Sequence, residues 1–192
     1  TCALPISISG DPGEFIQSGI GHIPEDRMTR GLVLDLSILD NMILGYQRRF
    51  QKHGILDRKR IRSFADGLLG EFGIKTPNPL VKANALSGGN QQKIVIARVF
   101  SEDPDIIIVA QPTRGVDIGA MEYIHERLLD LRDEGKAVLL ISADLDEVKN
   151  LSDRLAVIYD GKLVVEGKPE EFSDMELGLW MTGANGERRK EA

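Results

Sequence analysis

The chain has 192 residues, of which 42% are hydrophobic and 28% charged, a composition typical of one sizeable globular domain. Its formal net charge of −6 argues against a dedicated nucleic-acid-binding protein, which would normally carry a surplus of basic residues. No run of about 18 apolar residues is present, and a single cysteine excludes an internal disulfide framework. The histidines have no metal-ligand spacing, so no metal site is predicted; they are His22, His53 and His125.

Both ends of the chain are expected to lie outside the folded domain. The codons that could encode Thr-Cys-Ala-Leu-Pro-Ile resemble the end of a common sequencing-adapter oligonucleotide, so residues 1–6 are expected to be a scar of sequence assembly. An ordinary truncated reading frame is the alternative, and both interpretations make the chain a fragment. Residues 183–192 are predicted to form a disordered tail.

The stretch 37–85 is predicted to be mainly helical. One candidate helix runs from Asp40 to Phe50, and a second follows Asp57, which can cap it, to about Phe72. Arginine and lysine make this stretch locally basic. We interpret these side chains as a solvated helix surface; contact with another subunit or with lipid headgroups is the alternative.

From residue 86 onward the pattern changes to alternating helices and strands. Helices are predicted at 89–100, at 118–134 and from Asp144, and strands at 106–110, 137–141 and 155–159. The first two strands are continuous apolar runs, which is typical of strands covered on both faces. Asp160-Gly161 predicts a hairpin turn. This alternation predicts a parallel α/β core.

Residues 86–92 read Leu-Ser-Gly-Gly-Asn-Gln-Gln and lie at the start of a predicted helix. Ser87 can cap this helix, while Gly88 and Gly89 leave backbone N–H groups bare. A helix N-terminus with free amides binds anions such as the terminal phosphate of a nucleotide, and a side chain at either glycine would keep the phosphate away. Most Ser-Gly-Gly helix starts are plain caps, so the prediction depends on the longer string.

The whole string resembles the signature motif of ATP-binding cassette proteins, and its Asn-Gln-Gln continuation resembles that of the simple-sugar importers. Residues 112–117 resemble the D-loop segment of this family, and residues 19–27 its Q-loop region, with Glu25 at the place of the usual glutamine. The resemblance covers about residues 14–170. It implies that the signature residues contact ATP held by another cassette; they are Leu86, Ser87, Gly88, Gly89, Asn90 and Gln91.

The fold that the resemblance implies is the P-loop NTPase-like α/β cassette core over residues 7–182. Such a core is a parallel sheet flanked by helices, with a helical subdomain inserted here at about 37–85. No P-loop is present, because none of the Gly-Lys pairs is followed by serine or threonine. The fragment is therefore expected to begin after the P-loop. ATP and Mg²⁺ would be held mainly by the missing segment or by a partner cassette.

Three positions that carry acid–base chemistry in this family differ here. The Walker B acidic pair corresponds to Ala110 and Gln111, and the histidine that contacts the γ-phosphate corresponds to Ala143. Alanine has no metal-ligand atom, and glutamine cannot accept a proton at neutral pH. No intact catalytic set is therefore predicted in this chain.

The resemblance implies the ATP-binding, ATP-hydrolysing subunit of an importer for simple sugars or nucleosides. Its partners would be a second cassette in the same full-length chain, membrane permease subunits and, indirectly, a substrate-binding protein, with no nucleic acid. It would lie peripherally on the cytoplasmic face of the bacterial inner membrane. The string Ala-Gln-Pro-Thr-Arg-Gly resembles nucleoside-importing members.

We expect this half to supply its signature motif to the partner's ATP site, and the isolated fragment to be inactive. One alternative is a regulatory half that binds nucleotide without turnover. Another is a soluble cassette ATPase that acts on ribosomes or DNA.

Two further residues each have two possible roles. Asp117 matches the D-loop aspartate that would couple two ATP sites, and it also suits the N-cap of the following helix. Glu25 would sense nucleotide and face the membrane subunit, or it would be an exposed loop carboxylate paired with Arg27.

Overall fold

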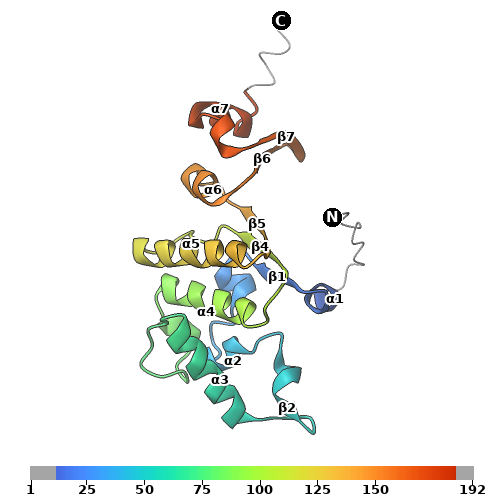
Figure 1. Cartoon of the computed structure of the whole chain (residues 1–192). Coiled ribbons are helices and arrows are strands. Elements are labelled where there is room, and N and C mark those ends of the chain that lie inside the picture. Colours follow the sequence, from blue (N-terminus) through green and yellow to red (C-terminus); the bar gives the residue numbers. More distant parts are fainter. Residues whose placement is uncertain (1–11, 185–192) are drawn as a thin grey trace, which may run out of the picture. The chain divides into compact units, whose positions relative to one another are not determined.

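The computed structural model describes residues 12–184 (Figure 1). The expected scar at 1–6 and residues 185–192 of the predicted tail lie outside this range. The chain divides into two compact units, unit 1 up to Leu139 and unit 2 from Leu140. No helix within residues 12–184 is long and apolar enough to cross a membrane.

A parallel pair of strands forms the centre of unit 1. Strand β1 (Ile20–Ile23) pairs in parallel with β4 (Ile106–Ala110), so that Ile23 lies opposite Val109. Both of these side chains are fully buried. Strand β5 (Ala137–Ile141) comes next in the sheet order β1-β4-β5. The sequence predicted β4 and β5 but not β1.

The prediction of β5 as a buried strand is only partly right. Leu139 is 54% and Ile141 49% exposed. Alternate side chains of a strand point to opposite faces of the sheet, so these two exposed side chains belong to the same face.

Helix α4 (Gly88–Phe100) is the element around which unit 1 is built. It confirms the predicted helix, and its side chains are buried on nearly every face. Its most extensive contacts are with β1, helix α2 (Ile38–Met42), helix α5 (Ile118–Asp133) and a π-helical turn (Arg27–Gly31). In Figure 1, α4 lies between α5 and α2.

The stretch 37–85 is partly as predicted. The elements that it contains are α2, a 3₁₀ turn (Gln47–Phe50), strands β2 (Gln51–Lys52) and β3 (Ile55–Leu56), helix α3 (Arg58–Glu71) and a second 3₁₀ turn (Ala83–Ala85). The single helix predicted from Asp40 to Phe50 is wrong, because the chain leaves the helix after Met42 and Gly45 takes a φ of +92°. The second prediction is confirmed: the Asp57 side chain accepts hydrogen bonds from the backbone N–H of Lys59 and Arg60.

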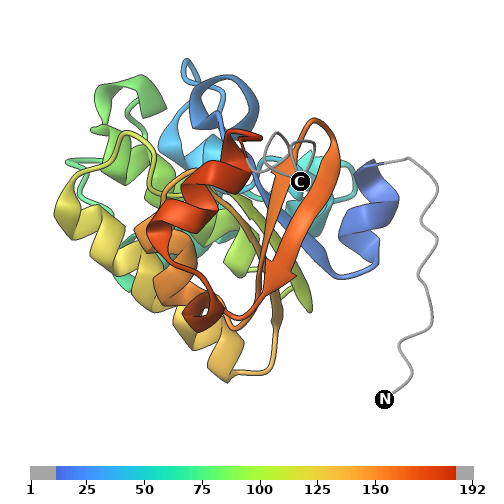
Figure 2. The same cartoon turned by 90° about the horizontal axis from the view of Figure 1, so that it is seen from above.

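Unit 2 contains the predicted hairpin between two helices. Its elements are α6 (Leu145–Leu151), β6 (Leu155–Tyr159), β7 (Lys162–Gly167) and α7 (Asp174–Met181). Asp160 and Gly161 both have positive φ, at 47° and 72°, as a type I′ turn requires. Leu155, Val157 and Leu177 form a small core, and α7 accordingly lies beside the hairpin in Figure 2.

A buried arginine joins α4 to the chain before it. Arg98 is 8% exposed, and its guanidinium donates to the carbonyl oxygens of Gly31 (2.7 Å) and Asn41 (3.1 Å). Burial lowers the pKa of Arg98. The side-chain amide of Asn41 in turn accepts from the backbone N–H of Val33 (2.8 Å) and donates to the backbone carbonyl of Val33 (3.0 Å). Polar contacts, and not only apolar packing, therefore fix residues 31–41 against α4.

The first turn of α4 lies very close to the first turn of α5. A Cβ added at Gly89 would stand 2.9 Å from the Cβ of Ala120 and 3.0 Å from Oδ2 of Asp117. Real Cβ atoms essentially never come within 3.0 Å of another heavy atom. The two helices can therefore approach this closely only because residue 89 is glycine.

Replacing Arg98 with methionine should lower the free energy of unfolding by about 2–4 kcal/mol, because two buried carbonyls lose their charged donor. Urea unfolding of the chain measures this. Arg30, which is exposed in the adjacent π-helical turn, gives the matched control Arg30→Met. A similar loss in both variants would contradict a special role for Arg98.

Replacing Gly89 with alanine should cost about 1–3 kcal/mol of stability through overpacking. The same change made in an Ala120→Gly background should cost less, since the nearest clashing atom is gone. A double-mutant cycle from four urea curves gives the coupling energy, which we expect to reach about 1 kcal/mol. Additive effects of the two changes would argue against the close approach.

Candidate functional site

Three segments of unit 1 meet at the first turn of α4. They are the segment 24–27 after β1, the turn 87–90 itself, and residues 111–117 after β4, which we call the 111–117 loop. Since β1 and β4 are parallel neighbours, the chain leaves both at the same edge of the sheet. The tertiary fold thus brings together segments that are far apart in the sequence.

The predicted signature residues form a capped helix start. Ser87 is exposed, and its Oγ accepts hydrogen bonds from Nδ2 (3.0 Å) and the backbone N–H (3.4 Å) of Asn90. Gly88 and Gly89 are the first two residues of the helix, so their amides have no partner inside it. An anion placed at this turn would therefore meet free N–H donors and the positive end of the helix dipole.

Two other predicted signature residues have structural contacts. The side chain of Gln91 is buried, and its Nε2 donates to the carbonyl of Ala83 at 3.1 Å. Oδ1 of Asn90 accepts from the N–H of Lys75 at 2.8 Å, which ties the turn to the end of the helical stretch. Leu86 is half-buried.

Each glycine of the turn faces a different neighbour. A Cβ at Gly88 would stand 2.7 Å from Nη2 of Arg27 and 2.9 Å from the carbonyl oxygen of Gly115, whereas Gly89 faces Ala120 and Asp117. The sequence predicted both glycines from the approach of a phosphate. The structure adds a second reason, which is close packing against the 111–117 loop and the start of α5.

Arg27 is the residue of this site that the sequence did not single out. Its Nη1 donates to the carbonyl of Arg114 at 2.7 Å and its Nη2 to that of Gly115 at 3.2 Å. These partners lie 87 and 88 residues away in the sequence, so no local pattern reveals them. The only available signal was an arginine after two acidic residues in the Q-loop-like region.

The residue before Arg27 fixes the direction of the chain. Asp26 caps the π-helical turn, where it accepts from the N–H of Met28 (2.9 Å) and from the N–H (3.1 Å) and hydroxyl (2.7 Å) of Thr29. The hydroxyl and the two amides lower the pKa of Asp26 below its ordinary value.

Glu25 forms an ion pair with Arg114, not with Arg27 as its alternative interpretation proposed. The Glu25 and Arg114 side chains are 53% and 68% exposed, so water screens the pair and its contribution to stability is small. The pair nevertheless joins the segment after β1 to the 111–117 loop.

Ala110 and Gln111, the two residues predicted to correspond to the Walker B pair, offer no carboxylate. Ala110 ends β4, and Gln111 has a φ of +48° at the start of a turn in which its carbonyl accepts from the N–H of Arg114 at 3.2 Å. Residues 12–184 contain no group of three or more His, Cys, Asp or Glu side chains that could hold a metal ion. The residues present at this position therefore do not fit a magnesium ion, and at the start of α4 two backbone amides have no partner within the helix.

The remaining predicted positions take these places. Asp117 is the N-cap of α5, as one of its two interpretations predicts: its Oδ1 accepts from the N–H of Ala120 at 2.9 Å. Ala143 belongs to unit 2, where it is exposed in the turn before α6. In that turn Ser142 Oγ accepts from the N–H of Asp144 at 3.0 Å.

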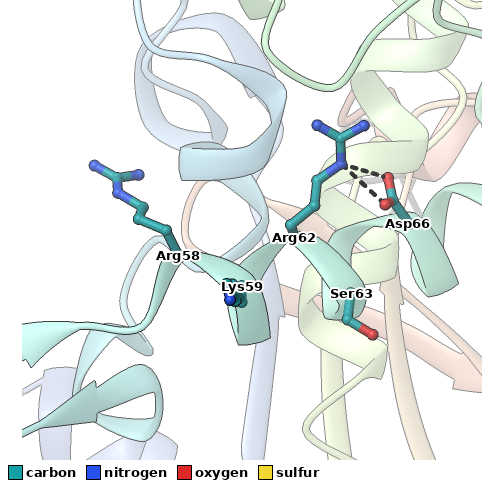
Figure 3. Close-up of a pocket in the computed structure, with 5 residues that line it drawn as sticks. All are labelled: Arg58, Lys59, Arg62, Ser63 and Asp66. Atoms are coloured by element: carbon teal, nitrogen blue, oxygen red, sulfur yellow. Dashed lines mark hydrogen bonds and ion pairs between the residues drawn. The ribbon is translucent and has the colours of Figure 1, made fainter.

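A pocket of about 490 Å³ lies elsewhere, on the exposed face of α3. The residues that line it are Arg58, Lys59, Arg62, Ser63 and Asp66 (Figure 3). Arg62 Nε donates to both carboxylate oxygens of Asp66, at 2.9 and 3.1 Å, and Arg58 pairs with Asp40 at 2.7 Å. These internal ion pairs favour a solvated basic helix surface, and no predicted site residue lines the pocket.

No protein-family model matches the chain, but individual relatives do. It is 46% identical over 175 residues to the guanosine import ATP-binding protein of Bacillus subtilis, covering 90% of this chain and 34% of that protein. It is 48% identical over 176 residues to the nucleoside import ATP-binding protein of Lactococcus lactis, covering 91% of this chain and 35% of that protein. It is 37% identical over 180 residues to a ribose import ATP-binding protein of Yersinia pestis, covering 94% of this chain and 36% of that protein. The chain thus spans about a third of the length of these relatives.

Solved structures match the fold. A dimeric ATP-binding cassette in a post-hydrolysis state, bound to ADP and phosphate, superposes with a TM-score of 0.67 and 28% identity over 84% of this chain and 69% of its own. A nucleotide-free cassette from an ABC transporter gives a TM-score of 0.66 and 23% identity over 90% and 68%. These matches confirm the predicted P-loop NTPase-like α/β fold with a parallel sheet flanked by helices. In sequence and in fold, the chain belongs to the family of ATP-binding cassette proteins.

Proposed function

We propose that this chain is part of the ATP-binding subunit of an importer, and that the first turn of α4 completes the ATP site of a partner cassette. The observation that carries the proposal is the Leu-Ser-Gly-Gly string at the start of α4, where Ser87 is exposed and the first two amides have no partner within the helix. Donors aimed at a transferring phosphoryl group stabilise the charge that develops on it.

The proposed cargo is a nucleoside. The relatives named for guanosine and nucleoside import are 46% and 48% identical to this chain, whereas those named for glucose and ribose import are 43% and 37% identical. The string that begins at Ala110 also resembles that of nucleoside importers. A simple sugar is the second candidate.

The proposed division of work follows from what the chain lacks. Neither Ala110 nor Gln111 can hold a magnesium ion through a carboxylate or accept the proton of an attacking water. The residues that hold Mg²⁺ and most of the ATP would therefore come from outside this chain, while Ser87 and the two glycines contribute hydrogen-bond donors. Asp117, beside Gly89, would relay changes between the two ATP sites.

The proposed partners are those of an importer: a second cassette, membrane permease subunits and, indirectly, a substrate-binding protein. The cytoplasmic face of the membrane is the proposed location. One solved structure that resembles the chain is described as a dimer, which supports pairing between cassettes.

A second candidate function is a regulatory half that binds nucleotide without turnover, which the absence of acidic and histidine side chains at 110, 111 and 143 favours. Nucleotide binding and hydrolysis, measured separately on the full-length protein, distinguish the two. Binding without any hydrolysis would support the regulatory half.

Replacing Ser87 with alanine in the full-length protein should lower the kcat of ATP hydrolysis about a hundredfold, the usual effect of removing one preorganised donor. Ser101→Ala is the matched control at the other end of α4, where Oγ donates to the carbonyl of Arg98 at 2.8 Å. Steady-state ATPase assays give the answer. Unchanged turnover in the Ser87 variant would refute the proposed role of the turn.

Replacing Gln111 with asparagine should leave the kcat within about twofold of the original, because the residue takes no proton in the proposed mechanism. Asparagine keeps the neutral amide and tolerates the positive φ at this position. The same ATPase assay applies. A loss as large as that of the Ser87 variant would show that the chain's own Walker B position takes part in the reaction.

A further inference from the structure

The side chain of Arg27 lies where the three segments of the site meet. Its two Nη atoms donate to successive carbonyls of the 111–117 loop, those of Arg114 and Gly115. The same guanidinium lies against Gly88, so closely that a Cβ there would stand 2.7 Å from Nη2. One side chain therefore touches both the loop and the signature turn.

The backbone of Arg27 is itself held by α4. Arg27 begins the π-helical turn, which ends at Gly31, and the carbonyl of Gly31 accepts from the buried Arg98 at 2.7 Å. A Cβ at Gly31 would stand 3.0 Å from Cγ2 of Val95, so this turn packs directly on the middle of the helix. Contacts with α4 thus fix the backbone from which the side chain of Arg27 reaches the start of the same helix.

We propose that Arg27 is a positioning residue, whose forked guanidinium holds the 111–117 loop against the first turn of α4 and so fixes the direction in which Ser87 faces a phosphate. The inference rests on the proposed function of that turn. The planar guanidinium can bond two successive carbonyls at once, whereas a lysine ammonium is a single point donor on a flexible stem. The exposed Glu25–Arg114 ion pair adds a second, weaker link between the same segments.

This arrangement has a mechanical consequence. The side chain of Arg27 joins the segment after β1, which resembles the Q-loop region, both to the signature turn and to the 111–117 loop. A displacement of residues 25–27 would therefore shift the 111–117 loop and the signature turn together. The positive charge of Arg27 beside a helix N-terminus could also act on a phosphate directly, so the experiment must separate charge from geometry.

The test is Arg27→Lys in the full-length protein, which keeps the charge and removes the fork. Arg30→Lys is the matched control, because Arg30 lies in the same turn and is exposed. Hydrogen exchange is measured by mass spectrometry at residues 90–91, whose N–H groups donate to Ser87, and at residues 112–117, with residues 58–71 of α3 as an internal reference. The kcat and KM of ATP hydrolysis are measured on the same samples.

We expect exchange in residues 90–91 and 112–117 of the Arg27→Lys variant to accelerate about tenfold, while α3 exchanges as before. The kcat should fall at least about tenfold, because a small misplacement of a donor is costly, while the KM for ATP changes less than about twofold. A general loss of stability would instead accelerate exchange in α3 as well. The Arg30→Lys variant should match the unchanged protein in every measurement.

Normal exchange together with a normal kcat in the Arg27→Lys variant would overturn the inference. If Ser87→Ala abolishes turnover in the same assay, the proposed function stands although the inference has failed. Normal exchange with a reduced kcat would also overturn the inference, since the fork would then not hold the loop. If turnover depends on Ser87, accelerated exchange with a normal kcat in the Arg27→Lys variant would refute the claim that Arg27 positions Ser87. If Ser87→Ala has no effect on turnover, the proposed function fails, and accelerated exchange still supports the contact between Arg27 and the loop.

Discussion

The close approach of the first turn of α4 to the 111–117 loop is the constraint on which the rest of unit 1 depends. Gly88 faces Arg27 and the carbonyl of Gly115, and Gly89 faces Ala120 and Asp117, at distances that leave no room for a Cβ. Two glycines in succession are needed here for two separate contacts. The same absence of side chains means that no Cβ covers the first amides of the helix, which have no partner within it. Packing and the candidate binding surface therefore impose the same sequence on this turn.

Polar side chains set the positions of the segments that surround this turn. Arg98 and Asn41 bind backbone groups of residues 31–41, and Arg27 binds the 111–117 loop. A buried or half-buried polar group is costly when its partners are lost, so such contacts favour one arrangement over near alternatives. Apolar side chains of α4 such as Ile94 and Val95 are fully buried in the core, while these polar side chains specify where the loops lie.

Membership of a family does not establish that a protein catalyses the family's reaction, because function depends on particular side chains placed on a shared fold. This chain has the fold of an ATP-binding cassette, with a Ser-Gly-Gly sequence at the start of α4 and with Ala110 and Gln111, neither of which is acidic, at the end of β4. The first turn of α4 and the end of β4 lie in the same unit; the first is proposed to offer hydrogen-bond donors, and the second has no carboxylate.

The sequence by itself determined the features whose causes are local. Asp57, Ser87, Asp117 and Asp144 cap helices by accepting from an N–H no more than three residues away, and Asp160-Gly161 fixes its own turn through two positive φ angles. The apolar run of β4 and the helical spacing of α5 likewise lie within single segments. Such signals can be read from neighbouring residues alone.

Only the tertiary structure decided the features whose partners are distant. Strand β1 is short and has no strand pattern of its own, and it forms because β4 offers it a parallel partner. The chain leaves α2 before Gly45, although the apolar spacing continues, and the hairpin β2–β3 follows. Arg27 and Arg98 gain their roles from carbonyls that lie 57 to 88 residues away. A local pattern cannot show these contacts, because a hydrogen bond between distant segments exists only after the helix and sheet have brought its two atoms together.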